Sequence, residues 1–387
     1  MQNTSSLIFT GDIGFDKYMA GRWRDSKLLS KDVLAFLREK DHLIVNVEGP
    51  LSDSEKKAGA PLTHSMNPEA VTFLDRIGAD VWNICNNHIM DAGEKGIADT
   101  LALAKKSGAK TLGAGMNLAQ AMAPVIFDEA GGIGMIGVGY QRACRAAAED
   151  KPGCYSFSEL EKIRNSIAEI KKTCRWCVVV AHAGEEFTPL PSPYTRKRYH
   201  DYLEMGADVV IAHHPHVPMN YETVGEKLIF YSLGNFVFDT DYQRAQYNTE
   251  KGLFIRLDFT ESDVSFKPFG IELDRKSGII GKSELPAVFE DVCDEEYNLL
   301  IPLSTAAFIE NTKRQLRFLK PDVFAGATEQ DFIDDFYRPM RSGCVPGETL
   351  DFTILYPLSL LAAQGAWRSS TLDGVKSYIL EQITGKL

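Results

Sequence analysis

Residues 207–217 read ADVVIAHHPHV, an apolar run that leads directly into three histidines. A short apolar run rich in β-branched residues is typical of a buried strand, and a helical pattern at Thr195–Met205 precedes it. Pro215 restricts the backbone between His214 and His216, which brings the two imidazoles close together. This stretch therefore predicts a buried strand that ends in potential ligands.

The alternation of strand and helix extends outward from this stretch, from residue 1 to about residue 260. It is typical of an α/β fold with a large sheet. The predicted strands are Leu7–Thr10, Leu43–Val47, Val81–Cys85, Ile133–Val138, Cys177–Ala181, Val209–Ala212 and Leu228–Leu233, followed by Leu253–Phe259 and Val264–Leu273 at a sheet edge. The predicted helices are Asp32–Glu39, Pro68–Ile77, Gly93–Ser107, Ser158–Thr173 and Thr195–Met205.

After about Ser283 the pattern becomes helical, and prolines separate the segments. We therefore predict an α/β body over residues 1–283 and a helical C-terminal extension over residues 284–387 that packs on it. The predicted helical segments are Val288–Leu319, Gln330–Arg341, Phe352–Gln364 and Leu372–Ile383.

Composition excludes several classes of protein. The 387 residues include 42 Lys and Arg against 53 Asp and Glu, a net charge of −11, which argues against nucleic acid and anionic membranes as main partners. The most apolar stretch, Thr353–Ala363, is too short to span a bilayer. The N-terminus lacks the basic start and apolar stretch of a secretory signal, so we expect a cytoplasmic protein. Seven scattered cysteines favour free thiols over a disulfide framework.

Polar residues follow five of the predicted strands. In open α/β sheets the carboxyl ends of the strands form the ligand crevice, so we expect these loops to meet there. They contain five of the eight histidines, which separate structural roles would not predict, although a single His or Asp after a strand is more often a turn residue. The five loops begin with Gly11-Asp12, Glu48-Gly49-Pro50, Asn86-Asn87-His88, His182-Ala183-Gly184 and His213-His214-Pro215-His216.

The side chains in these loops are of the types that bind divalent metals. Carboxylate oxygens, imidazole nitrogens and an Asn oxygen favour Mn²⁺, Zn²⁺, Fe or Mg²⁺, and no cysteine lies among them. Six ligands exceed what one tetrahedral site needs, so a two-metal site is the sharper hypothesis.

The order of these motifs resembles the bacterial capsule synthesis family of the CapA, poly-γ-glutamate biosynthesis type, a branch of the calcineurin-like metallophosphoesterase superfamily. The resemblance covers about residues 6–260 and implies a four-layer α/β/β/α sandwich with a dimetal centre at the strand ends. The motifs are GD at 11–12, NVEGPLS at 46–52, NNHIMDAGEKGIADTL at 86–101, AHAGEEF at 181–187, ADVVIAHHPHV at 207–217 and KLIFYSLGNFVFD at 227–239.

The resemblance also implies roles for individual residues. His88 matches the superfamily's catalytic histidine, and Asp91, one helical turn on, is spaced to orient it. Glu186 matches an acidic position that contacts substrate or supports the metal ligands. In the implied ligand set, Asp12 and His216 hold one metal, Glu48 bridges, and Asn87, His182 and His214 hold the second. Asn86, Ser232 and Asn235 are expected to organise the metal loops.

One position departs from the superfamily pattern. Gly14 stands where superfamily phosphoesterases usually carry a histidine, so the first metal site lacks one imidazole and would take Asp16 or water instead, or stay empty. Two functions remain open. One is a metal-dependent hydrolase that acts on an anionic polymer, such as poly-γ-glutamate or a polysaccharide, or on a small phosphate or acyl substrate. The alternative is a non-catalytic accessory or polymer-binding component of a capsule polymer synthase.

Overall fold

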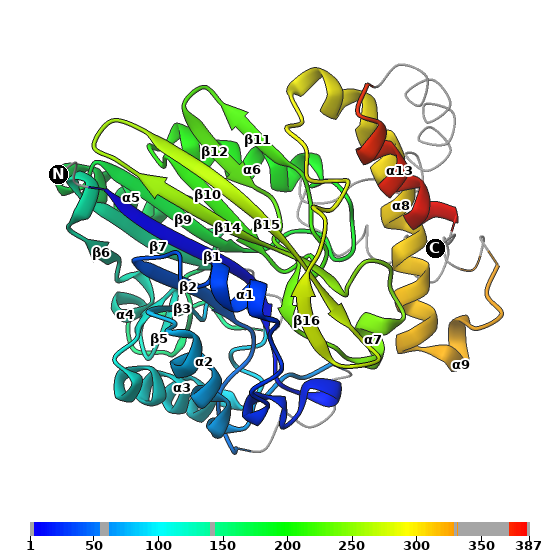
Figure 1. The fold of residues 1–387 in the computed structure, drawn as a ribbon, viewed down its shortest axis with the longest axis horizontal. Coiled ribbons are helices and arrows are strands. Elements are labelled where there is room, and N and C mark those ends of the chain that lie inside the picture. Colours follow the sequence, from blue (N-terminus) through cyan, green and yellow to red (C-terminus); the bar gives the residue numbers. More distant parts are fainter. Residues whose placement is uncertain (1–3, 55–61, 140–143, 329–330, 332–370, 385–387) are drawn as a thin grey trace.

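A computed structural model describes residues 4–54, 62–139, 144–328, 331 and 371–384. Within these residues the body consists of two β-sheets that face each other, with helices on their outer sides (Figure 1). The predicted α/β class is confirmed, and its layers follow the order helix, sheet, sheet, helix.

The larger sheet has eight strands and contains the N-terminal strand at its middle. β1, β2, β3 and β4 run parallel, whereas β14 pairs antiparallel with β1. The predicted strands 253–259 and 264–273 are therefore confirmed as an extension of this sheet beyond β1. Its order is β16 (Ile279–Lys282), β15 (Val264–Asp274), β14 (Lys251–Phe259), β1 (Ser5–Ile13), β2 (His42–Val47), β3 (Val81–Asn83) and β4 (Lys110–Leu112), with β13 (Asn235–Val237) also paired to β1.

The smaller sheet has six strands, and its centre is also parallel. β7, β9, β10 and β12 run in the same direction, and β6 and β11 are antiparallel neighbours at the two edges. Its order is β11 (Tyr221–Val224), β12 (Lys227–Phe230), β10 (Val209–His213), β9 (Trp176–His182), β7 (Ile133–Gly139) and β6 (Val125–Phe127). A separate short pair joins β5 (Ala114–Gly115) and β8 (Gly153–Cys154).

The two-residue period of a strand divides the apolar side chains between two cores. Leu7 and Phe9 pack between the sheets, where they join Val178 and Val180 of the opposite sheet. Ile8 points to the other face of its sheet and joins the cluster under the helices. Because both faces of each central strand are covered, the strands are continuous apolar runs rather than alternating ones.

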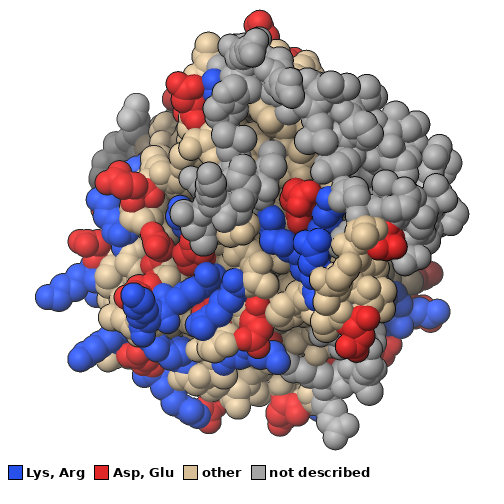
Figure 2. Space-filling view, turned by 90° about the vertical axis from the view of Figure 1, so that its right-hand side faces the viewer, with Lys and Arg blue, Asp and Glu red and all other residues tan. Residues whose placement is uncertain are grey.

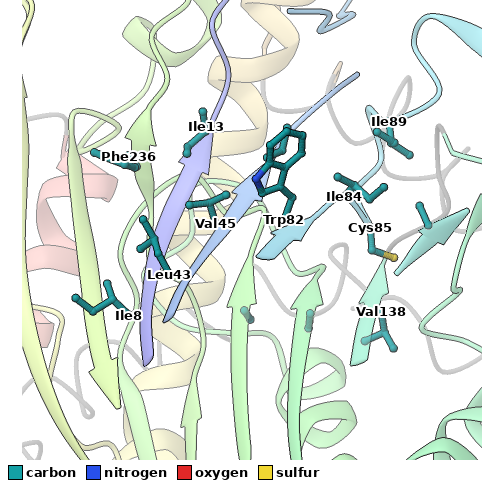
Figure 3. Close-up of a cluster of buried hydrophobic side chains, with 14 of the residues drawn as sticks. Ile8, Ile13, Leu43, Val45, Trp82, Ile84, Cys85, Ile89, Val138 and Phe236 are labelled. Carbon is teal, nitrogen blue, oxygen red and sulfur yellow. The ribbon is translucent and has the colours of Figure 1, made fainter. Parts of the chain in front are cut away.

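Helices cover the outer face of each sheet. Figure 3 shows Ile8, Leu43, Val45 and Trp82 projecting from β1, β2 and β3 into the cluster that these helices complete. Over the larger sheet lie α1 (Lys31–Phe36), α2 (Val71–Ile77) and α3 (Gly93–Ser107), and over the smaller one lie α5 (Leu160–Thr173) and α6 (Pro193–Glu204). Shorter helices are α4 (Leu118–Met122), α7 (Asp241–Arg244) and α9 (Pro321–Phe324).

The start of α6 follows from its capping sequence. The Ser192 hydroxyl accepts a hydrogen bond from the Thr195 amide at 3.2 Å, and Pro193 occupies the first helical position, where its missing N–H costs nothing. The helix therefore begins two residues before the predicted 195.

The C-terminal part pairs two helices at one end of the body (right side of Figure 1). α8 (Asp294–Leu319) packs on α13 (Asp373–Thr384) through residues such as Leu300 and Val375. α8 begins later than the predicted 288, because the segment before it pairs with β11: the Tyr221 amide donates to the Glu290 carbonyl and the Val292 amide donates to the Tyr221 carbonyl. The predicted helices 330–341 and 352–364 lie outside the described residues, and the division at 283/284 stays a prediction. In the described chain, every helix is too short or too polar to cross a bilayer.

Candidate metal centre

The site lies at the carboxyl ends of parallel strands from both sheets. Asp12 is the second-last residue of β1, Glu48 follows β2, and His182 ends β9. His214 and His216 follow β10. β1 to β3 run parallel, as do β9 and β10, and the 3.8 Å approach of His182 Nε2 to Glu48 Oε1 brings the C-terminal loops of the two sheets together at one end of the sandwich.

Glu48 is the centre of this cluster. Its side chain is fully buried, and neither carboxylate oxygen accepts a hydrogen bond. Glu48 Oε1 lies 3.5 Å from His216 Nε2, 3.8 Å from His182 Nε2 and 4.0 Å from His88 Nε2. A buried carboxylate without donors is costly, and a cation in contact with it removes that cost. These residues therefore fit a metal ion.

Among the described residues, two groups of side chains could hold a metal ion, and Glu48 belongs to both. Ligand atoms of Glu48, His214 and His216 lie within 4.8 Å of one another, as do those of Asp12, Glu48 and His182. Asn87 adjoins the second group, because its Oδ1 lies 2.9 Å from His182 Nε2. All six residues of the implied ligand set thus come together, although their division between two metals stays a prediction.

Two asparagines inside strands hold Asp12 in place. The Asn46 amide of β2 donates to Asp12 Oδ1 at 2.8 Å, and the Asn83 amide of β3 donates to Asn46 Oδ1 at 2.8 Å. The sequence analysis did not identify either residue. Their signal was present, since each is a polar residue in an otherwise apolar strand, where burial requires a partner.

The loop after β10 has an unusual backbone. His214 and His216 have φ of +99° and +59°, values that side-chain-bearing residues seldom adopt and that cluster at functional sites. The loop is held from one side by the His214 amide, which donates to Asp12 Oδ2 at 3.4 Å. From the other side, the Phe187 amide donates to the Pro215 carbonyl at 2.8 Å.

His216 is oriented by Asn235, the first residue of β13. His216 Nδ1 donates to Asn235 Oδ1 at 3.0 Å, and the Asn235 amide donates in turn to Gln243 and to the Thr249 carbonyl. Asp12 Oδ2 lies 3.3 Å from the same His216 nitrogen. The predicted organising position of Asn235 therefore has a direct contact with one proposed ligand.

His88 is bound to Asp91 as the spacing predicts. His88 Nδ1 donates to Asp91 Oδ2 at 2.7 Å, which leaves Nε2 directed toward Glu48. The same Asp91 oxygen accepts a hydrogen bond from the His64 backbone amide at 2.8 Å. The His64 and His88 rings pack edge to face, with ring centroids 4.2 Å apart. No sequence motif identifies His64, whose Nδ1 is paired with Asp16 Oδ2 at 2.8 Å. Asp16 is thus held by His64.

The other residues predicted for the site make different kinds of contact around the proposed ligands. Asn86 joins the β2 and β3 loops, since its Oδ1 accepts from the Gly49 and His88 amides. Glu186 Oε1 is 4.0 Å from His214 Nε2, and its other oxygen accepts from the Tyr242 hydroxyl at 2.7 Å. Ser232 stabilises a turn by accepting from the Gly234 amide. His213 donates to the Thr10 carbonyl at 2.9 Å, which gives it a structural tether.

Position 14 has no room for a side chain. A Cβ on Gly14 would lie 2.5 Å from the ring of Phe238, and the Gly14 amide donates to the Val237 carbonyl at 2.7 Å. The Phe238 ring also packs against His216, with ring centroids 5.0 Å apart. Phenylalanine therefore fills the space beside the site at which the superfamily pattern has a histidine.

Burial and mutual charge shift the pKa values of the cluster in opposite directions. Burial raises the pKa of Glu48, and burial, together with His64, lowers the pKa of His88 to about 4. Burial and His214 lower the pKa of His182. Burial also lowers the pKa of His216, but the negative charges of Glu48 and Asp12 outweigh this effect and raise its pKa to about 10. A divalent cation would favour the Glu48 carboxylate and neutral imidazoles, so its binding would release protons.

The helical extension supports the same loops. The side-chain amide of Asn311 in α8 donates a hydrogen bond to the carbonyl of Phe187. The Phe187 ring is stacked with the His216 ring, with ring centroids 6.0 Å apart. Phe318 of α8 lies against Tyr242, with ring centroids 5.6 Å apart. Figure 2 shows this end of the molecule, where Lys and Arg side chains gather among acidic ones. The contacts of Asn311 and Phe318 therefore stabilise the loops that carry Glu186 and His216.

A family profile described as "Bacterial capsule synthesis protein PGA_cap" matches residues 6–240. This match covers more than half of the chain and includes every proposed metal ligand. The chain belongs to this family.

Curated relatives agree with the profile. The chain is 30% identical to the "PGA biosynthesis protein CapA" of Bacillus subtilis over 272 residues, which are 67% of this chain and 71% of that protein. It is 30% identical to the "Capsule biosynthesis protein CapA" of Bacillus anthracis, over 56% of this chain and 55% of that protein. It is 25% identical to a "Probable polyglutamine synthesis accessory protein" of Mycobacterium tuberculosis, over 51% and 56%. The chain thus spans only about half the length of the last two.

Solved structures offer a more distant likeness. A hypothetical protein from Thermus thermophilus aligns with a TM-score of 0.40 and 13% identity, covering 69% of this chain and 99% of that one. A second protein of the same organism, TT1561, aligns with a TM-score of 0.38 and 10% identity, covering 73% and 99%.

Proposed function

We propose that this protein is a metal-dependent hydrolase of the capsule synthesis family. The observation that carries the proposal is the state of Glu48, whose two buried oxygens lack hydrogen-bond donors and are surrounded by imidazoles. Buried carboxylates are ordinarily hydrogen-bonded, so this arrangement is better explained by a cation than by a structural role.

Asp12, Glu48, Asn87, His182, His214 and His216 would hold the metal, and Glu48, which belongs to both candidate groups, would be shared if two ions bind. Bound Mn²⁺, Zn²⁺, Fe or Mg²⁺ would supply a water of lowered pKa and neutralise charge on a phosphoryl or acyl oxygen. The protein's own contribution is orientation. Asn46 fixes Asp12 and Asn235 fixes His216, so two of the six ligands are held before a metal arrives.

His88 is proposed as the catalytic residue that, once its Nε2 has gained a proton, stabilises charge or donates that proton to a leaving group. Asp91 holds its Nδ1, so the ring presents Nε2 toward the Glu48 side of the site. Groups positioned in this way typically contribute about 10²- to 10⁴-fold to the rate of such reactions. Asp91 acts through His88 as a positioning residue, and Glu186, which lies beside His214, is proposed to contact substrate or to support that ligand.

The substrate class is proposed from the relatives, whose names concern PGA and capsule biosynthesis. The proposed substrate is an anionic polymer such as poly-γ-glutamate, or a small phosphate or acyl compound. Arg244 is partly exposed, although it is paired with Asp239, and it lies two residues from Tyr242, which bonds Glu186. Hydrolysis would then serve the synthesis, trimming or turnover of the polymer.

The test combines metal analysis with a substrate panel. The protein is stripped with a chelator, reloaded with Mn²⁺ or Zn²⁺, and assayed on p-nitrophenyl phosphate, bis-p-nitrophenyl phosphate and poly-γ-glutamate. We expect metal-dependent turnover, and we expect His88→Ala to lower it at least about 100-fold while metal content stays near that of the parent. His42→Ala is the matched control, because His42 begins β2 at the opposite end from Glu48. Equal loss of metal in His88→Ala would assign His88 to ligation instead.

A second candidate, a non-catalytic accessory component of a polymer synthase, is favoured by one observation. Phe238 fills the space at Gly14, so the first metal site has one imidazole fewer than the superfamily pattern. A metal-loaded chain that binds poly-γ-glutamate in sedimentation or calorimetry, yet hydrolyses nothing in the panel, would support this function over the enzyme.

A further inference from the structure

Three cysteines from distant parts of the sequence gather behind the loop that carries Asn87 and His88. Cys85 directly precedes this loop and its thiol donates to the Tyr155 carbonyl at 3.5 Å. The Cys154 thiol donates to the Asn86 carbonyl at 3.4 Å. Cys144 completes the group, and its Sγ lies 2.7 Å from Cys154 Sγ.

The contact between Cys144 and Cys154 is closer than two non-bonded sulfur atoms ordinarily approach. A disulfide bond is about 2.05 Å long, so the two sulfurs would need to move by less than about 1 Å to bond. The backbone around them is already paired, because the Cys154 amide donates to the Arg145 carbonyl at 3.0 Å and the Ala147 amide donates to the Cys154 carbonyl at 2.8 Å. These backbone hydrogen bonds therefore hold the two thiols next to each other.

The only C-x-x-C spacing among the described cysteines lies elsewhere in the chain. Cys174 and Cys177 form the C-x-x-C motif of the chain, but in the described structure no hydrogen bond joins their thiols, and Cys177 belongs to β9. Cys293 is exposed and precedes α8. Cys144 and Cys154 are ten residues apart and have no motif between them, so their contact is visible only in the fold.

We propose that Cys144 and Cys154 are an oxidation site, at which hydrogen peroxide converts the two thiols to a reversible disulfide. The Cys144 thiolate attacks one peroxide oxygen and the O–O bond breaks, which gives a sulfenic acid at Cys144 and, after protonation, one water. The Cys154 sulfur then attacks the Cys144 sulfur and displaces its hydroxyl as a second water. Two thiols are oxidised by two electrons in total, and the peroxide is reduced to two waters.

Reaction at this pair is slower than at an exposed thiol. Both side chains are buried, and the pKa of each thiol is raised, that of Cys144 by its contact with Cys154 and by burial, that of Cys154 by burial first. A small uncharged oxidant is therefore the suitable reagent, since it needs less space than a glutathione disulfide.

Disulfide formation also changes a contact of the neighbouring loop. Once bonded, Cys154 has no S–H to donate to the Asn86 carbonyl, and Asn86 adjoins the proposed metal ligand Asn87. This effect on the loop rests on the proposed function, whereas the bond itself does not.

Peptide mapping tests the proposal directly. The metal-free chain is treated with graded hydrogen peroxide, denatured in N-ethylmaleimide, and digested with trypsin without reductant. Cleavage after Arg145 places the two cysteines on separate peptides. We expect a linked pair of peptides containing Cys144 and Cys154, two hydrogens lighter than their sum, which dithiothreitol separates. Alkylation of both residues at every peroxide level, or their cross-linking to other cysteines, would overturn the proposal.

Variants supply the specificity control. Cys144→Ser should abolish the linked peptide, whereas Cys293→Ser should leave its yield unchanged. If Cys144→Ser fails to fold, mapping of the parent protein alone decides the question. Because the readout is a covalent mass, it needs neither bound metal nor turnover, so its failure is distinguishable from failure of the proposed function.

Discussion

Replacing Glu48 by Gln is the sharpest test of the metal centre. The substitution keeps the size of the side chain but removes the negative charge that both candidate ligand groups share. We therefore expect Glu48→Gln to abolish most of the thermal stabilisation that Mn²⁺ gives the parent protein. The variant also loses the attraction between Glu48 and His216, so each protein is compared with its own metal-free form.

The expected size of the effect follows from mass action. A ligand at about 100 times its dissociation constant stabilises the folded state by about 2.7 kcal/mol. With an unfolding entropy of about 2.1 cal/mol/K per residue and about 280 residues unfolding together, this raises the melting temperature by about 4 °C to 5 °C. If Glu48→Gln weakens the metal affinity about 100-fold, the same Mn²⁺ concentration stabilises the variant by only about 0.4 kcal/mol. Its melting temperature then rises by less than about 1 °C.

Differential scanning fluorimetry across a Mn²⁺ series measures both rises. The matched control is Glu222→Gln, because Glu222 is an equally buried carboxylate that accepts hydrogen bonds from Arg196 and His200. Its loss should lower the metal-free melting temperature and leave the Mn²⁺-induced rise intact. A Glu48→Gln variant that keeps the full rise of the parent would refute the dimetal proposal.

Three further variants test the supporting structure. Gly14→Ala should lower the free energy of unfolding in urea by about 1–3 kcal/mol, because its Cβ would lie 2.5 Å from a ring carbon, whereas Gly281→Ala, with open space around it, should not. Asn46→Leu removes the donor to Asp12 and should weaken Mn²⁺ binding by about 10- to 100-fold in calorimetry; unchanged affinity would mean that Asp12 needs no support. Ser192→Ala removes the cap of α6 and should cost about 1 kcal/mol in urea without changing Mn²⁺ affinity.

The strands and the loops that follow them were predictable from local sequence. Apolar runs such as 177–181 and 209–212 are long enough to identify buried strands, and each is followed at once by a polar residue. Strand direction then places those residues at one end, because parallel neighbours share the position of their carboxyl ends. The identity of the ligand set needed the family resemblance as well, since many strands end in Asp, Asn or His for structural reasons.

Asn235 and Asp91 were predicted as supporting residues, but other partners in the site were not. Asn46 and Asn83 connect neighbouring strands, and His64 reaches His88 and Asp16 from a segment with no motif. Such contacts depend on register and side-chain direction after the sheets have packed. The sequence analysis likewise left Asp16 open as a replacement metal ligand, whereas the folded chain pairs it with His64.

By itself, the order of amino acids determined which segments become strands and which residue types stand at their ends, and these types are ones that suit divalent metals. Only the folded chain decided that Glu48 lies among imidazoles without a donor, that Phe238 occupies the space at position 14, and that Cys144 touches Cys154. The reason is physical: strand propensity is a local property, whereas desolvation, steric exclusion and sulfur contact depend on atoms that only packing of the two sheets and their loops brings together.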